Sequence, residues 1–160
     1  MILDVGCGGG EEGQIFIQLK QDNVIHIDLD RGAHHLEVRG DAHTLPFRDK
    51  TFSVVHASHI LEHLEYPTKA LREWKRVSRR VIVHVPNVVT AYGTEHPAHL
   101  YNWNIWTLKQ LCRTVFENVE VKGTTRFILR HEDSFIKKFL VFWITLPLRL
   151  RPNQLTAECS

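Results

Sequence analysis

Short apolar runs alternate with amphipathic stretches along most of the chain. Four of these runs predict strands, near residues 2–5, 24–28, 52–57 and 80–85. Apolar residues at helical spacing predict three helices, near residues 11–20, 68–78 and 107–115. Strands that alternate with helices in this way are typical of a doubly wound α/β fold, in which a mostly parallel sheet lies in a three-layer α/β/α arrangement.

The helix near residues 68–78 has the clearest pattern. Pro67-Thr68 provides a start signal, and apolar residues recur on one face of the helix. The opposite face carries the basic residues Lys69, Arg72, Lys75 and Arg76. Such a face could bind nucleic-acid phosphates, but a solvated helix face shows the same pattern. We therefore expect no nucleic-acid partner.

An apolar insert at about residues 126–151 follows residues 118–122, which read as a strand. The apolar run within residues 135–150 is about half as long as the ~20 residues that a membrane span requires. We expect the insert to form a lid, which could bind an apolar substrate, or to form a contact in a homo-oligomer. Contact with a membrane surface through 135–150 is the alternative.

Composition narrows the class of protein without giving its function. The 160 residues suit a single domain over residues 1–160, and the 43% hydrophobic and 24% charged residues are typical of globular proteins. Cys7, Cys112 and Cys159 lie far apart, which argues against a disulfide framework or a cysteine-based zinc site. The first residues show no secretory signal pattern, so we expect a cytoplasmic protein.

A glycine-rich turn, Asp4-Val-Gly6-Cys-Gly8-Gly-Gly10, follows the first predicted strand. Glycine permits both a sharp turn and the close approach of a ligand to the backbone. The turn also fits the dinucleotide-binding pattern, because Asp28 lies at the spacing of a ribose-binding acid. The turn alone therefore does not identify its ligand, although the carboxylate of Asp4 favours a ligand with a cationic end.

Three further segments follow the turn in order. They are Ile25-His-Ile-Asp28-Leu29-Asp30, then Gly40-Asp41-Ala42 with Leu45-Pro46-Phe47, then Val54-Val55-His-Ala57-Ser58-His59-Ile-Leu61-Glu62-His63. With the turn, these segments resemble the class I S-adenosylmethionine-dependent methyltransferase family, in its type 11 branch. The resemblance implies a Rossmann-like sheet whose last strand, at the C-terminal end of the chain, is antiparallel.

The resemblance also implies a site for S-adenosylmethionine, with S-adenosylhomocysteine as the product. Asp28 would accept hydrogen bonds from both ribose hydroxyls, Asp41 would accept one from the adenine amino group, and Asp4 would lie near the ammonium group. The other cofactor-binding residues would be Gly6, Cys7, Gly8, Gly10, Leu29, Ala42, Leu45, Ala57 and Ser58. Structural alternatives exist, because Asp28 and Asp41 could cap turns while Leu29, Leu45 and Ala57 could be core residues.

Methyl transfer is an in-line displacement that depends on alignment and on the exclusion of water. A base helps only where the acceptor must lose a proton, and His59, His63 and His99 are the candidates. The pattern His59-x-x-Glu62-His63 also matches an inverted zinc-protease motif, but so short a pattern recurs by chance. We therefore expect no metal site.

Two departures from the family pattern bear on activity. Ser53 stands where the family usually has an acid, and the helices that normally precede the first strand are missing from the sequence. We expect an enzyme that methylates an unidentified small-molecule acceptor. The alternatives are a catalytically silent methyltransferase-like binding module and, less favoured, a nicotinamide-dependent oxidoreductase.

Overall fold

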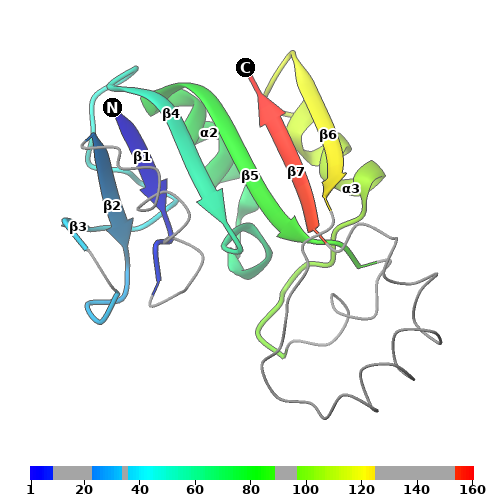
Figure 1. Cartoon of the computed structure of the whole chain (residues 1–160), viewed down its shortest axis with the longest axis horizontal. Coiled ribbons are helices and arrows are strands. Elements are labelled where there is room, and N and C mark those ends of the chain that lie inside the picture. The colour runs from blue at the N-terminus through cyan, green and yellow to red at the C-terminus, as the bar shows by residue number, and fades with distance from the viewer. Residues whose placement is uncertain (9–22, 34–35, 89–96, 125–153) are drawn as a thin grey trace, which may run out of the picture.

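The computed structural model of the chain describes residues 1–8, 23–33, 36–88, 97–124 and 154–160. Seven strands form one sheet in the order β3-β2-β1-β4-β5-β7-β6 (Figure 1). The strands are β1 (Ile2–Val5), β2 (Val24–Asp28), β3 (Val38–Arg39), β4 (Phe52–Ser58), β5 (Ser78–Pro86), β6 (Val119–Thr124) and β7 (Gln154–Cys159). The described helices are α2 (Pro67–Val77), α3 (Ile105–Arg113) and the 3-10 turn η1 (Leu61–His63).

Strand β7 is the antiparallel member of the sheet. It pairs in an antiparallel manner with both β5 and β6. The pairs β1–β2, β1–β4, β2–β3 and β4–β5 are parallel. This arrangement confirms the predicted Rossmann-like sheet with an antiparallel last strand.

Helices α2 and α3 cover the same face of the sheet and lie behind it in Figure 1. Alternate residues of β4 and β5 point to this face because side chains alternate along a strand. Val55, Val81 and Val83 are fully buried there, as is the indole of Trp74 from α2. The helix predicted at 11–20 and the apolar insert at 126–151 lie outside the described residues.

The sequence predicted most element boundaries to within two residues. Helix α3 begins at Ile105 rather than at 107 because the Asn104 side chain caps it, accepting a hydrogen bond from the Thr107 backbone amide at 2.9 Å. Helix α2 ends at Val77 and β5 begins at the next residue. Strand β3 was not predicted, because two residues are too few to show an alternating pattern.

The order of the strands determines where a ligand can bind. The chain passes from β1 outward to β2 and β3, and then returns to the other side of β1 to form β4 and β5. The carboxyl ends of β1, β2 and β4 therefore meet where the direction of winding reverses, which is the usual ligand position in such sheets. Among the described residues, no helix is both long and apolar enough to cross a membrane.

Candidate functional site

A cavity of about 410 Å³ lies at this reversal point, within the usual size range of ligand pockets. Its walls come from the end of β1, the end of β2, the loop after β3 and the segment from η1 into α2. The lining residues are Val5, Gly6, Ile27, Asp28, Leu29, Gly40, Asp41, Ala42, His43, Ile60, His63, Leu64, Glu65, Tyr66 and Lys69. Five of the predicted cofactor residues are thus brought together with one predicted base, His63.

Gly6 forms the floor of the turn after β1 and requires glycine for two reasons. Its φ of +74° lies in the left-handed region, which side chains other than glycine rarely adopt. A Cβ atom built on Gly6 would lie 2.5 Å from Cδ1 of Ile60, so the space above it is already filled. Gly8 also has a positive φ, of +55°. Gly10 lies outside the described residues.

Asp28 ends β2 and joins the walls of the cavity. Its Oδ2 accepts a hydrogen bond from the Gly8 amide at 2.8 Å, and its Oδ1 accepts one from the Asp30 amide at 2.9 Å. The carboxylate therefore caps the turn that follows β2, as the capping alternative suggested, and it also shapes the glycine turn after β1. Each carboxylate oxygen has two acceptor sites, so these bonds leave capacity for a ligand diol.

Asp41 and His43 form a second polar wall in the loop after β3. Oδ1 of Asp41 accepts from the His43 backbone amide at 2.8 Å and lies 2.7 Å from His43 Nδ1. These interactions lower the pKa of the Asp41 carboxyl, first through the backbone hydrogen bond and then through the side chain. Nε2 of His43 accepts from the Tyr66 amide at 3.4 Å, which connects this wall to the start of α2. Asp41 is therefore an ionised acceptor at neutral pH.

Asp4 does not line the cavity. Its buried carboxylate lies between two histidines of neighbouring strands, with Oδ2 3.0 Å from His26 Nδ1 and Oδ1 2.8 Å from His56 Nδ1. Burial alone would raise the pKa of Asp4, but the hydrogen bonds from His26 and His56 outweigh it and lower that pKa. Both carboxylate oxygens of Asp4 therefore have histidine partners, and the predicted contact between Asp4 and an ammonium group stays a prediction.

The other predicted cofactor residues fall into two groups. Leu29 and Ala42 line the cavity, and the Leu29 side chain is 62% exposed, which excludes the core alternative for it. Leu45 and Ala57 belong to the hydrophobic core, as the structural alternative suggested. Cys7 is buried, which raises the pKa of its thiol to about 12, so it is not a nucleophile at neutral pH. Ser58 and Gly8 are not among the lining residues.

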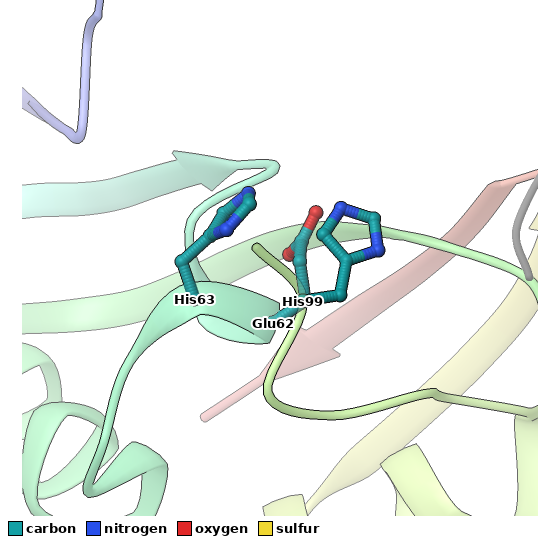
Figure 2. A group of neighbouring side chains, drawn as sticks. All are labelled: Glu62, His63 and His99. Carbon is teal, nitrogen blue, oxygen red and sulfur yellow. The ribbon is translucent and has the colours of Figure 1, made fainter. Parts of the chain in front are cut away.

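Of the three candidate bases, His63 lines the cavity, and His59 and His99 lie close to the η1 turn that carries it. His59 has a φ of +51° and its Nδ1 lies 3.4 Å from Oε1 of Glu62. The rings of His63 and His99 are 4.8 Å apart between centroids, although the two residues are distant in sequence. Figure 2 shows His63, His99 and Glu62 with their side chains on the same side of the η1 turn.

Several lining residues were not predicted from the sequence. His43 is the clearest of them, and its position two residues after Asp41 in a turn could have indicated it. Ile60 and Tyr66 could not have been found in this way, because their place in the wall depends on how η1 and α2 pack on the sheet. The basic face of α2 is partly used within the protein, since Arg76 binds Glu73 and Asp49.

Comparison with known proteins gives matches in sequence and in structure. Residues 3–81 match the family described as "Methyltransferase domain", of type 11. An uncharacterised methyltransferase of Schizosaccharomyces pombe is 32% identical over 99 residues, which are 49% of this chain and 36% of that protein. The chain spans less than half the length of the curated relatives it matches.

Two solved structures share the fold. An S-adenosylmethionine-dependent methyltransferase from Archaeoglobus fulgidus aligns with a TM-score of 0.68 and 21% identity, over 99% of this chain and 84% of that one. A Haemonchus contortus phosphoethanolamine N-methyltransferase, in complex with phosphomonomethylethanolamine and S-adenosylhomocysteine, aligns with a TM-score of 0.65 and 13% identity, over 99% and 48%. The chain therefore matches the S-adenosylmethionine-dependent methyltransferase family over residues 3–81, and the solved structures show that it shares the fold of that family.

Proposed function

We propose that this protein transfers a methyl group from S-adenosylmethionine to a small-molecule acceptor. The observation that carries the proposal is the pair of acids, Asp28 and Asp41, that line one cavity next to the left-handed turn at Gly6. A nucleoside offers hydroxyl donors on its sugar and an amino donor on its base, and both need acceptors. Two carboxylates on neighbouring walls provide such acceptors.

The arrangement of the cavity suggests the orientation of the cofactor. Asp28 would hold the ribose hydroxyls, and the exposed Leu29 would pack against the adenine ring. Asp41, on the loop after β3, would accept from the adenine amino group, near Ala42. The close turn at Gly6 would then face the methionine part. Asp4 acts only indirectly in this proposal, because it is paired with His26 and His56.

The sheet itself argues against a nicotinamide cofactor. Dinucleotide-binding folds of this class have the strand order 3-2-1-4-5-6. In this protein an antiparallel strand, β7, is inserted between β5 and β6. The glycine pattern fits both a dinucleotide and S-adenosylmethionine when the sequence alone is considered. The strand order of the sheet around it favours S-adenosylmethionine.

The acceptor is expected to bind beside His63, on the wall formed by η1 and α2. When bound, S-adenosylmethionine supplies an electrophilic methyl group whose transfer requires a nucleophile in line with the breaking bond. The segment from Ile60 to Tyr66 would position that nucleophile and exclude water. The solved Haemonchus relative is named for a small amine substrate, which agrees with a small-molecule acceptor here.

Incubation with methyl-labelled S-adenosylmethionine and fractionated cell metabolites tests this proposal. We expect label in one or a few small-molecule fractions, and none when excess S-adenosylhomocysteine is present. If S-adenosylhomocysteine binds but no fraction accepts label, the protein is a silent methyltransferase-like binding module and the proposed transfer is wrong.

A further inference from the structure

Glu62 is a buried acid whose charge is poorly compensated. The residue is 1% exposed, and within the described part of the chain neither carboxylate oxygen accepts a hydrogen bond. Nδ1 of His59 lies 3.4 Å from Oε1, too far for a strong charge-assisted bond. An ionised carboxylate in such a place is costly unless a cation compensates it.

His63 is oriented toward the same place by a backbone hydrogen bond. Its Nδ1 lies 2.9 Å from the carbonyl oxygen of Ala98. A carbonyl oxygen only accepts, so Nδ1 carries the proton and Nε2 carries the lone pair. Metal-binding histidines are typically oriented in this way, with one ring nitrogen held by a carbonyl and the other turned to the ion.

His99 is held close to Glu62 by the chain on either side of it. The amides of Leu100 and Tyr101 both donate to the carbonyl oxygen of Glu62, at 2.8 and 3.2 Å. The Ala98 carbonyl binds His63, as described above. These bonds hold the loop that carries His99 against the η1 turn. Contacts of the neighbouring backbone therefore keep His99 close to Glu62 and His63.

We propose that Glu62, His63 and His99 bind one divalent transition-metal ion. Each of the three offers one ligand atom, and these atoms all lie within 4.8 Å of one another (Figure 2). Two imidazoles and one carboxylate suit Zn²⁺ and other divalent ions that prefer nitrogen and oxygen ligands. The sequence predicted no metal site, because the proximity of His99 to Glu62 and His63 arises from the fold and is not visible in the sequence.

The proposed ion would have a coordination position open to the cavity. His63 is an exposed lining residue of the cavity, whereas Glu62 is buried behind it. Three protein ligands leave at least one position for water or for a substrate atom. If the proposed methyl transfer is correct, on which this step rests, the acceptor would present an oxygen or nitrogen atom that can bind the ion.

Metal binding can be measured without any assay of activity. Competition between the protein and a chromophoric chelator gives the affinity for Zn²⁺, and the visible spectrum with Co²⁺ reports its coordination. We expect one ion per chain, and Glu62→Gln and His99→Gln should each weaken binding by about tenfold or more. Glu117→Gln, which changes an exposed glutamate in the turn after α3, is the matched control and should bind Zn²⁺ like the wild type.

Thermal unfolding separates loss of the site from loss of the fold. Zn²⁺ should raise the melting temperature of the wild type and of Glu117→Gln, and it should have little effect on Glu62→Gln or His99→Gln. Without metal, Glu62→Gln should be no less stable than the wild type, because it removes a buried charge that is poorly compensated. Absence of Zn²⁺ binding by the wild type, or equal affinity in all four proteins, would overturn the proposal. Neither result depends on whether S-adenosylhomocysteine binds.

Discussion

At the scale of single residues, Asp28 has two roles that the structure does not separate. Its carboxylate holds the amides of Gly8 and Asp30, and the same group lines the cavity. A substitution therefore removes ligand acceptors and loosens the turn at the same time. An acid that shapes a binding turn in this way is expected to affect ligand affinity more than global stability.

Asp28→Ala should weaken the binding of S-adenosylhomocysteine by about 1–3 kcal/mol, which is the cost of an unmade hydrogen bond to a charged group. Isothermal titration calorimetry measures this loss. Asp30→Ala is the matched control, because Asp30 is an acid in the loop directly after Asp28 that does not line the cavity. Its carboxylate accepts a hydrogen bond from the Gly32 amide at 3.0 Å. Equal affinity of wild type and Asp28→Ala would contradict the proposed cofactor orientation.

Positions at the cavity were predictable from the sequence where local geometry decides them. Gly6 follows β1 and Asp28 ends β2, and residues at such positions reach the ligand edge of a parallel sheet. Asp4 lies inside β1, where its side chain points to one face of the sheet beside the side chains of its register partners. Its partners, His26 and His56, are set by strand register, which the sequence does not show.

At the scale of elements, one polar cluster joins three central strands. Asp4 of β1 stands opposite His26 of β2 and His56 of β4 in the register of the sheet. The hydrogen bond to Asp4 raises the pKa of His26, although burial opposes this change. Protonated His26 and ionised Asp4 therefore stabilise the contact between β1 and β2.

The contribution of His26 to stability should depend on pH. Because its pKa is raised above the ordinary value of 6.5, its stabilisation is complete below that value and is lost as the pH rises through the raised pKa. His26→Asn should therefore lower the free energy of unfolding by about 1–3 kcal/mol at about pH 5.5, and by less at about pH 9. Asp4 stays ionised at both values because its pKa is lowered from 3.8.

Urea denaturation of wild type and variant at both pH values measures this difference. Groups that titrate equally in the two proteins contribute equally to both free energies of unfolding. The difference between these free energies therefore reports the contribution of His26. A destabilisation by His26→Asn that is the same at both pH values, or greater at the higher one, would show that the pair of His26 and Asp4 does not carry the charge described here.

Elements with a strong period were predictable, whereas the two-residue strand β3 and the exact start of the capped helix α3 were not. The strands β1, β2 and β4 lie where apolar runs predicted them, because each run is long enough to show its pattern. The two-residue β3 is held by its pairing with β2 rather than by its own sequence. The start of α3 depended on a side-chain cap at Asn104, which hydrophobic spacing does not reveal.

At the scale of the whole molecule, the winding of the sheet determines the site. Because β4 returns to the other side of β1, the segment that follows β4 joins the ends of β1 and β2 around one cavity. The alternation of strands and helices predicted a doubly wound sheet, and the resemblance to the methyltransferase family implied the antiparallel last strand. The proximity of His99 to Glu62 and His63 could not be predicted, because it depends on the packing of the segment after β5 against η1.

The central claim is that this cavity accepts the adenosyl cofactor and not a dinucleotide. Titration calorimetry with S-adenosylhomocysteine and, separately, with NAD tests it most directly. The account predicts one molecule of S-adenosylhomocysteine bound per chain and no heat of binding from NAD. Binding of NAD alone, or no binding of S-adenosylhomocysteine at millimolar concentration, would contradict it.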